Sequence, residues 1–410
     1  MSGIPKTMRA VVYRGVNDLR LETVPVPRIG SNELLVKVAV CGVCPTDIKK
    51  IQYGTVPPPR IFGHETAGTI VKIGGGNSGL KTQNSKLKIQ NLKIGDRVAL
   101  HHHVPCMDCH FCRHRAFAQC ETYKRTGITA GFEPSGGGYA EYVRVMDFVL
   151  PGVVKIPAKN SFAEGAMLEP VNTVLKAVKK LNLLRGDNVL VAGQGPIGLM
   201  FTKILQLRGI NVLATDLLES RLKLAKKFGA KWTVNASRRR RKESLTNLSL
   251  VTSTPTTQPS TLNFQLDSAI IAVPSDDAVT QALQLVRGGG QILLFAHTRR
   301  AASIQNSKFK IQNSNPQPST LNPQLDLASI CLDEKDLIGS YSADFTLQRE
   351  TARLVFTRRL DVRPLITHQF PLAETADAIA LAARPAPDSL KIVVSTLNSQ
   401  PSTDFQWQRT

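Results

Sequence analysis

Four cysteines lie in one short stretch of the chain, with the spacing C-x2-C-x2-C-x7-C. Four thiolates at this spacing can close a tetrahedral shell around Zn²⁺ and leave no open position for a substrate. Disulfides are a second use of the thiols, which a reducing compartment disfavours. An iron–sulfur cluster is a third, although the C-x3-C-P continuation of ferredoxin-type ligation is absent. We predict a structural zinc site formed by Cys106, Cys109, Cys112 and Cys120.

A second group of potential ligands is spread more widely. Cys44 lies in CGVCPTD, His64 and Glu65 lie in FGHETAG, and Glu169 lies in MLEPV. A thiolate, an imidazole and a carboxylate can hold Zn²⁺ while a fourth position stays open for water or substrate, which is the mark of a catalytic site. The second histidine of the metalloprotease motif H-E-x-x-H is missing, because position 68 is Gly. We predict a catalytic zinc, with either Glu65 or Glu169 as the carboxylate ligand.

A glycine-rich turn of the form G-x-G-x-x-G follows a β-rich apolar run in the second half of the chain. Gly193 permits the turn, Gly195 lets a pyrophosphate approach the backbone, and Gly198 allows close packing of the helix that follows. The N-terminus of that helix favours a phosphate. Pro196 and Ile197 lie in the same turn. These five residues are the predicted binding segment for a dinucleotide.

An acidic residue ends the next predicted strand, NVLAT. Asp216 is placed to accept hydrogen bonds from the adenosine ribose hydroxyls and to repel a 2′-phosphate, which favours NAD over NADP. An N-cap for the next helix is the alternative role of the same residue. Arg221, five residues on, would weaken the discrimination if it turned toward the ribose.

Two segments of the chain, each with its own pattern of strands and helices, must position these residues. Up to about residue 150, short strands such as MRAVVY, LLVKVAV, AGTIVKI and DRVAL are separated by Gly and Pro, which indicates a β-rich domain. Strands and helices then alternate: NVLAT, LLESRLKLAKKFGA, SAIIAVP, a helix with Ser275 as its N-cap, a break at Gly288–Gly290, and QILLFA. This alternation predicts an α/β fold with a doubly wound parallel sheet.

Three segments interrupt these patterns and are interpreted as insertions, at 77–91, 237–266 and 299–325. NSKLKIQN returns as NSKFKIQN, and QPSTLNFQLD returns as QPSTLNPQLD, at irregular intervals. We expect them to be surface loops, because added loop length costs little closure entropy. They hold twelve Lys or Arg residues and one acid, so they contribute more than half of the formal net charge of +21. A nucleic-acid role for RRRRK at 238–242 is therefore disfavoured, since no aromatic residues are interleaved with it.

The composition is that of a globular protein, with 42% hydrophobic and 20% charged residues over 410 positions. A chain of this length favours two domains. No run of about 18 apolar residues could cross a bilayer, and the first residues lack the apolar region of a secretory signal. We therefore expect a cytoplasmic enzyme or binding protein. Cys41 and Cys331 are expected to be small buried residues, and His101 to His103 to have a rim or core role.

The motifs GVCPTD, GHE and LEP, together with the four-cysteine loop and a dinucleotide fold downstream, resemble the zinc-dependent medium-chain alcohol dehydrogenases. Within that family the chain looks most like the polyol branch, which includes sorbitol or iditol 2-dehydrogenase. The resemblance runs from about Met8 to Val394 and implies a GroES-like catalytic domain and a Rossmann cofactor domain. The implied limits are a catalytic domain at 1–155, an NAD-binding domain with insertions at 156–344, a return to the catalytic domain at 345–398 and a disordered tail at 399–410.

The resemblance also implies roles for single residues. Cys44 and His64 match the first ligands of the catalytic zinc, and Glu65 a direct or exchanging ligand. Glu169 stands where the polyol branch has Glu and the simple alcohol branch has Cys. Thr46 matches the hydroxyl that starts the family's proton relay. The four-cysteine loop matches its structural zinc site, so the implied cofactors are two zinc ions and NAD.

The implied reaction is the oxidation of a secondary alcohol or polyol. Zinc lowers the pKa of the alcohol as a Lewis acid, Thr46 passes the proton on, and the carbon delivers hydride to NAD, which leaves a ketone and NADH. The implied partners are a small-molecule substrate and further copies of the chain, as a homodimer or homotetramer. A threonine 3-dehydrogenase-like enzyme is one alternative. A zinc- and nucleotide-binding protein that its insertions have deprived of catalysis is another.

Overall fold

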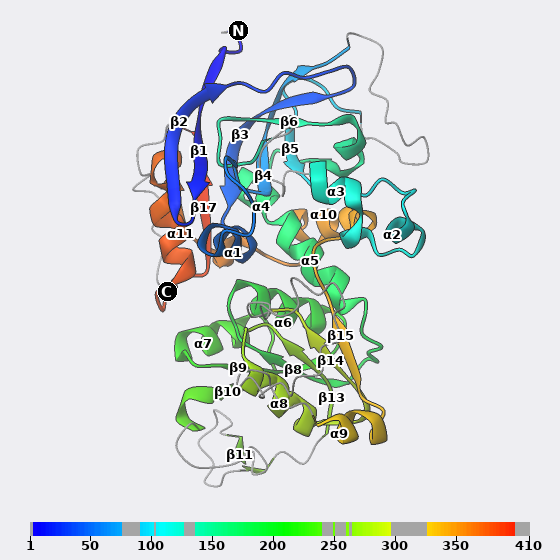
Figure 1. The fold of residues 1–410 in the computed structure, drawn as a ribbon. Helices are drawn as coiled ribbons and strands as arrows, with labels where there is room; N and C mark the ends of the chain where they lie inside the picture. Colours follow the sequence, from blue (N-terminus) through cyan, green and yellow to red (C-terminus); the bar gives the residue numbers. More distant parts are fainter. Residues whose placement is uncertain are drawn as a thin grey trace, which may run out of the picture. The chain divides into compact units, whose positions relative to one another are not determined.

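The computed structural model describes residues 3–75, 91–101, 104–126, 136–239, 249–250, 260–261, 265–296 and 326–397. Two compact units form from them (Figure 1). Unit 1 combines Met1–Lys176 with Ser342–Thr410, and unit 2 is Ala177–Tyr341. Most of the three predicted insertions and the whole tail at 399–410 lie outside the described residues. Among those that are described, no helix is long and apolar enough to span a membrane.

Unit 1 is built on a largely antiparallel sheet of seven strands in the order β16-β17-β3-β4-β5-β7, with β6 also paired to β3. A separate pair, β1 and β2, forms a hairpin. The nine strands are β1 (Thr7–Gly15), β2 (Asp18–Pro25), β3 (Leu34–Gly42), β4 (Glu65–Ile73), β5 (Arg97–Leu100), β6 (Tyr142–Val145), β7 (Val153–Lys155), β16 (Ile366–Pro371) and β17 (Lys391–Ser395).

The helices of unit 1 are short, and the longest of them, α5, runs across the unit limit at Lys176. They are α1 (Pro45–Tyr53), α2 (His110–Arg113), α3 (Glu121–Thr126), α4 (Phe162–Ala166), α5 (Leu168–Val178), α10 (Gln348–Phe356) and α11 (Thr375–Ala383). Helix α4 packs on β3, β4 and β5. This packing places α4 in unit 1, whose limit lies at Lys176 within α5.

The central strand β3 is buried on both faces, which matches its almost unbroken apolar sequence LLVKVAVCG. Alternate residues therefore serve two cores. Leu34, Val36 and Val38 pack with residues of β4, β5 and β6. Cys41 packs on the other face among residues of β1, α1, α11 and β17. The end of β3 is thus fixed from both sides, immediately before Cys44.

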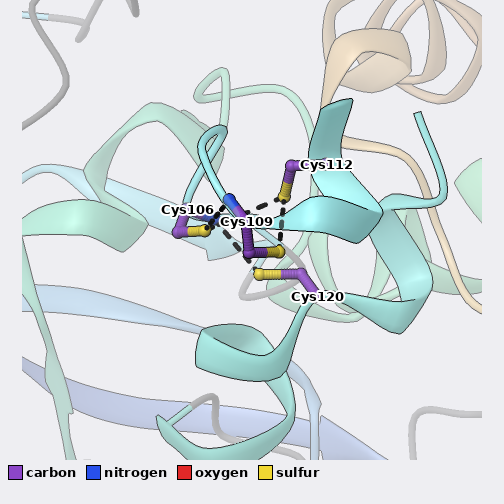
Figure 2. A group of neighbouring side chains, drawn as sticks. All are labelled: Cys106, Cys109, Cys112 and Cys120. Carbon is purple, nitrogen blue, oxygen red and sulfur yellow. Dashed lines mark hydrogen bonds between the residues drawn. The ribbon is translucent and has the colours of Figure 1, made fainter. Parts of the chain in front are cut away.

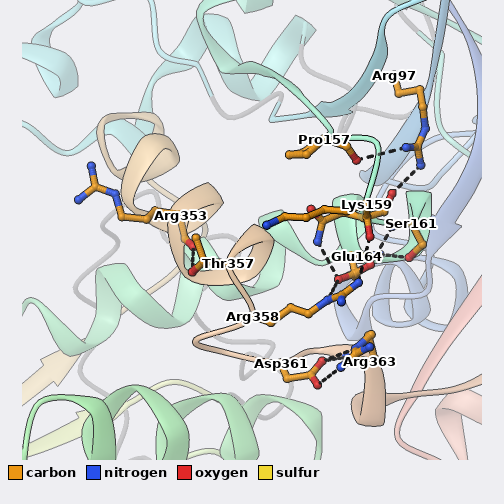
Figure 3. Close-up of polar contacts among 11 residues, drawn as sticks. Arg97, Pro157, Lys159, Ser161, Glu164, Arg353, Thr357, Arg358, Asp361 and Arg363 are labelled. Atoms are coloured by element: carbon orange, nitrogen blue, oxygen red, sulfur yellow. Dashed lines mark hydrogen bonds and ion pairs between the residues drawn. The ribbon is translucent and has the colours of Figure 1, made fainter.

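A polar cluster fixes the start of α4 (Figure 3). Ser161 and Glu164 form a capping box, in which each side chain accepts from the other residue's backbone N–H, at 3.1 and 2.7 Å. The buried Glu164 carboxylate also accepts from Nε of Arg358 (3.1 Å) and Nδ2 of Asn160 (2.9 Å). Arg358 follows α10, so this cluster connects the C-terminal part of unit 1 to its N-terminal part.

Unit 2 contains a six-stranded sheet in the order β10-β9-β8-β13-β14-β15, with every neighbouring pair parallel. Its strands are β8 (Asn188–Ala192), β9 (Asn211–Asp216), β10 (Trp232–Asn235), β13 (Leu266–Ile271), β14 (Val286–Leu294) and β15 (Asp336–Gly339), with a small antiparallel pair, β11 (Ser249–Leu250) and β12 (Ser260–Thr261). The order reverses between β8 and β13, as in a doubly wound fold. The predicted fold class is confirmed.

The helices of unit 2 follow the predicted pattern, but one strand, β14, differs from the prediction. They are α6 (Pro196–Leu207), α7 (Glu219–Lys227), α8 (Asp276–Leu285) and α9 (Leu327–Leu332). Ser275 caps α8 by accepting from the N–H of Ala278, as predicted. The predicted break at Gly288–Gly290 is wrong, because these glycines lie inside β14. There β14 advances five residues while β13 advances two, so the glycines form a bulge rather than a gap.

Candidate active site and metal centres

The four cysteines predicted to bind zinc converge in unit 1 (Figure 2). Their sulfur atoms all lie within 4.8 Å of one another, and none of the seven cysteines forms a disulfide. The backbone N–H groups of Cys106 and Cys109 each donate to a sulfur of the cluster, both at 3.3 Å. The loop reverses through Met107 and Arg115, which have φ of 65° and 57°. Four sulfurs with backbone donors match the donor set of a structural zinc site.

The ionisation of these thiols is uneven. Burial works to raise the pKa of Cys106, but backbone N–H donors of Asp108 and Cys109 lower it to about 6. Burial raises the pKa of Cys112, and its hydrogen bond with Cys109 adds to the increase. Protons are thus shared unequally among adjacent sulfurs. A divalent cation would favour thiolates at all four positions, so the residues present fit a bound zinc ion.

Three residues of the predicted catalytic group also converge. Cys44 is the N-cap residue of α1, directly after β3. His64 precedes β4 and Glu65 begins it. Their ligand atoms lie within 4.8 Å of one another, with His64 and Glu65 only 3% and 1% exposed. The pairing of Gly42 with Glu65 between β3 and β4 explains how residues about twenty positions apart come together.

A second carboxylate holds the imidazole. Nδ1 of His64 lies 3.1 Å from Oδ1 of Asp47, which is 1% exposed. Burial would lower the pKa of His64, but the charges of Asp47 and Cys44 raise it well above its usual value. Tyr139 donates its hydroxyl to Oδ2 of Asp47 (3.3 Å). With Nδ1 beside Asp47, Nε2 is the nitrogen that would bind a metal ion, since a ligating histidine usually has its other ring nitrogen bonded to a carboxylate or carbonyl oxygen.

Glu169, the other predicted carboxylate, is buried on α5. Burial raises its pKa to about 7, against the opposing charge of His64 and with a further increase from the negative charge of Glu65. It therefore lies within electrostatic reach of the cluster but is not one of the three residues within 4.8 Å. Thr46 is half-buried in the first turn of α1, two residues after Cys44.

Sequence reasoning missed three residues of this site. Asp47, Tyr139 and Lys391 all contact one of the predicted ligands or its partner. Asp47 could have been found from the sequence, because it follows Cys44 by about one helical turn. Tyr139 and Lys391 had no such signal, because they lie far from the ligands in the sequence and only the folded chain brings them to the site.

The predicted dinucleotide-binding residues form the turn between β8 and α6. Gly193 has φ of 90°, and a Cβ there would overlap the side chain of Val273. A Cβ at Gly198 would overlap the carbonyl oxygen of Gly193. Gly195 has nothing within 4 Å of a Cβ position, so its surface stays open. Pro196 and Ile197 form the first turn of α6, with Gly195 as N-cap. These are the features that phosphate binding at a helix N-terminus requires.

Asp216 ends β9, and both of its carboxylate oxygens accept backbone hydrogen bonds. Oδ2 accepts from the N–H of Gln194 (2.7 Å) and Oδ1 from the N–H of Leu218 (2.9 Å). The N-cap residue of α7 is Leu218 rather than Asp216. Arg221 lies with Nη1 3.9 Å from Oδ2 of Asp216. The carboxylate is therefore fixed beside the glycine turn, with a guanidinium next to it.

Three smaller predictions concern residues outside these groups. His101 is fully buried, and burial lowers its pKa to about 3, so it has a core position. Residues 102–103 lie outside the described residues. Cys41 is buried as predicted, but Cys331 is exposed, so that prediction was wrong. Cys331 lies on the short helix α9, which has no buried residue.

Two family models match the chain. The alcohol dehydrogenase GroES-like domain matches residues 30–158, and the zinc-binding dehydrogenase domain matches residues 196–354. Together they include the four-cysteine loop, Cys44, His64 and Glu65, and most of the sheet of unit 2, whereas Glu169 lies between the two matched ranges. The chain belongs to the zinc-dependent medium-chain alcohol dehydrogenase family. The resemblance seen in the sequence is confirmed, and so are zinc and a nicotinamide dinucleotide as the cofactors of this dehydrogenase.

Curated members of the family align with nearly the whole chain. Sorbitol dehydrogenase of Bombyx mori is 27% identical over 395 residues, which is 95% of this chain and 99% of the relative. Sorbitol dehydrogenase of Bacillus subtilis (strain 168) is 27% identical over 398 residues, which is 95% of this chain and 98% of the relative. These matches support an enzyme that oxidises or reduces alcohols, as the sequence predicted.

Solved structures of the family share the fold. A zinc-binding dehydrogenase from Sinorhizobium meliloti 1021, bound to NADP, has a TM-score of 0.75 at 24% identity and covers 95% of this dehydrogenase and all of its own chain. An alcohol dehydrogenase from Thermus sp. ATN1 has a TM-score of 0.69 at 25% identity, with 95% and 99% covered. The GroES-like and Rossmann architecture is thus confirmed.

Proposed function

We propose that this dehydrogenase oxidises a secondary hydroxyl group of a polyol with NAD as the acceptor. The observation that carries the proposal is the cluster of the half-buried Cys44 with the buried His64 and Glu65, whose ligand atoms lie within 4.8 Å of one another. The sorbitol dehydrogenases among its relatives favour a polyol over a simple alcohol. A thiolate, an imidazole and a carboxylate form a set that holds zinc with one position open.

Each residue of the cluster has a distinct part in the proposal. When bound, zinc supplies Lewis acidity at the substrate oxygen, and the nicotinamide accepts the hydride. Cys44, His64 and Glu65 would hold the ion. Asp47 keeps the imidazole oriented through Nδ1. Thr46, half-buried beside Cys44, would receive the proton of the substrate hydroxyl and pass it toward solvent.

Glu169 has a different role in this proposal. Its pKa of about 7, raised mainly by burial, makes it easier to protonate at neutral pH than an ordinary glutamate. We assign the third ligand position to Glu65, because its carboxylate lies within 4.8 Å of Cys44 and His64, whereas Glu169 would act from outside this group as a carboxyl group that can bond a water or the substrate. The closer approach of Glu65 to Cys44 and His64 supports this choice between the two carboxylates that the sequence left as alternatives.

The preference for NAD rests on Asp216. Its carboxylate is fixed by two backbone N–H groups at the end of β9, where an adenosine ribose is bound in dinucleotide folds. A 2′-phosphate would meet its negative charge. Arg221 at 3.9 Å reduces that repulsion, so the preference is expected to be moderate.

We further propose a cytoplasmic enzyme that forms a homodimer or homotetramer. The edge strand β15 of unit 2 has one sheet neighbour, β14, among the described strands, and an open edge of this kind can pair with a second copy. Light scattering of the purified chain measures the oligomeric state.

The test is a panel of sorbitol, xylitol, threonine and simple alcohols, assayed for NADH formation, with zinc content measured on the same sample. We expect the polyols to be oxidised fastest and NAD to be preferred over NADP. Faster oxidation of threonine would favour the threonine dehydrogenase alternative. Full zinc content without any NADH formation would contradict the proposal and support a binding protein without catalysis.

A further inference from the structure

A buried ammonium group lies beside the predicted zinc ligands. Lys391 begins β17 and is 5% exposed. Its Nζ lies 2.6 Å from Oε1 of Glu65 and forms a closer ion pair with Oε2. The same Nζ donates to the carbonyl oxygen of Val43 (2.9 Å), the residue before Cys44. The Lys391 ammonium therefore contacts Glu65, which is a candidate zinc ligand, and the backbone immediately before Cys44, which is a second candidate ligand.

The sheet explains how this contact forms across an intervening strand. Gly42 of β3 pairs with Glu65 on one side and with Val393 of β17 on the other. A Cβ at Gly42 would overlap Oε2 of Glu65 and lie 3.0 Å from Cε of Lys391. The missing side chain lets the two groups meet over β3. The strand pairing of the sheet therefore holds the two buried side chains of the ion pair together.

The charges make Lys391 a competitor for the carboxylate. The Lys391 ammonium and the Glu65 carboxylate form an ion pair in which both side chains are buried, 6% and 2% exposed. A buried carboxylate such as Glu65 requires a positive partner. Two partners are within its reach once a metal ion is bound, namely the ion and Lys391. A stronger contact of the Glu65 carboxylate with the metal ion therefore means a weaker contact with Lys391, and the reverse.

We propose that Lys391 is a positioning residue that competes with the bound metal ion for Glu65 and so determines how firmly Glu65 ligates. The inference rests on the proposed function, because it requires a metal ion at Cys44 and His64. With Lys391 present, Glu65 is shared between the ammonium and the metal ion, so a water or substrate can replace Glu65 as a ligand of the ion. Without the ammonium, Glu65 becomes a permanent ligand.

The experiment measures zinc release from the full-length, zinc-loaded chain to an excess of a chromophoric chelator, without substrate or NAD. The catalytic-site phase is identified as the phase that is missing in Cys44→Ser. We expect Lys391→Met to slow this phase about tenfold, because Glu65 then has the metal ion as its remaining cationic partner; residues bonded to a metal ligand alter metal affinity by about 10–100-fold. An unchanged or faster release would overturn the proposal.

Three further variants keep the result interpretable. Lys391→Arg retains the cation and should release zinc at the wild-type rate. Lys391→Gln keeps a hydrogen-bond donor without the charge and should also slow release, which preserves the test if Lys391→Met does not fold. In a Glu65→Gln background, Lys391→Met should have no additional effect, because the group they compete for is gone. An additive effect in that background would contradict the competition.

Failure of this inference can be told apart from failure of the proposed function. If wild type and Cys44→Ser contain equal amounts of zinc, no ion is bound at Cys44 and the proposed function fails. If the zinc content differs but Lys391→Met and wild type release it equally fast, only the role of Lys391 is contradicted.

Discussion

The imidazole of His64 is held by a carboxylate that solvent does not reach. Asp47 is 1% exposed, and its pKa is lowered because the charge and hydrogen bond of His64 outweigh the effect of burial. Tyr139 donates to its second oxygen. A buried anion of this kind fixes which ring nitrogen carries the proton, so its contribution to metal binding is large although it is not itself a ligand.

Asp47→Asn is therefore expected to lower the zinc affinity of the catalytic site by about 10–100-fold. The amide fills the same space but provides no negative charge to the imidazole. Competition with a chelator of known affinity measures the effect. Asp96→Asn serves as the matched control, because Asp96 pairs with Lys155 at 2.7 Å away from the site. Equal losses in the two variants would contradict the role given to Asp47.

Glu164 yields a prediction about stability and pH. Burial would raise its pKa, but hydrogen bonds from Arg358, Ser161 and Asn160 lower it overall. A carboxyl group whose pKa is lower in the folded state stabilises the fold above its unfolded pKa, and this contribution is lost as the pH falls through the folded value. Glu164→Gln should lower the free energy of unfolding by about 1–3 kcal/mol at pH 7.

The difference between Glu164→Gln and wild type should shrink as the pH is lowered below about 4.3, the usual pKa of an unfolded glutamate. Denaturant titrations at a series of pH values between 7 and 3 would measure it. A difference that stays constant over this range would show that the carboxylate charge does not carry the effect.

At the scale of the element, the glycines of the turn between β8 and α6 have two different roles, one in packing and one in cofactor binding. Gly198 is required for packing, because a Cβ there overlaps the carbonyl oxygen of Gly193. Gly195 has an ordinary φ of −66° and open space around its Cβ position. Its missing side chain matters only when a pyrophosphate lies against the backbone.

We therefore expect Gly195→Ala and Gly198→Ala to differ. Gly198→Ala should lower the melting temperature, since the helix must shift away from the turn. Gly195→Ala should leave the melting temperature unchanged and weaken NADH binding, as measured by fluorescence titration. If Gly195→Ala binds NADH as tightly as wild type, the turn does not hold the cofactor phosphates.

The elements also show which parts of the site the sequence could predict. The four cysteines and the pair His64–Glu65 were predictable because metal ligands of the right type lie close together in the chain. Lys391 follows Glu65 by 326 positions, and no periodic pattern relates them. Only the strand order β17-β3-β4 brings them together.

The bulge in β14 was missed for a related reason. A run of three glycines is typical of a loop, and only the pairing of β13 with β14 on both sides of the run shows that the strand continues.

At the scale of the whole molecule, both groups of metal ligands belong to unit 1 and the glycine turn belongs to unit 2. A ligand stabilises the part of a protein that binds it. Removing zinc should therefore lower the temperature of one calorimetric transition, and adding NADH to the metal-free chain should raise that of the other. A single transition that both ligands shift equally would show that the two units unfold together.

Unit 2 interrupts the chain of unit 1, since residues 342 onward return to the sheet that residues 1–176 began. Strand β17 lies between β16 and β3 in that sheet. During translation, the N-terminal ligands emerge from the ribosome long before the lysine that pairs with Glu65. The nascent chain must complete all of unit 2 before β3 gains β17 as its partner. The face of β3 that carries Cys41 packs against Ile392 and Val394 of β17, so it gains this cover only after most of the chain has been synthesised.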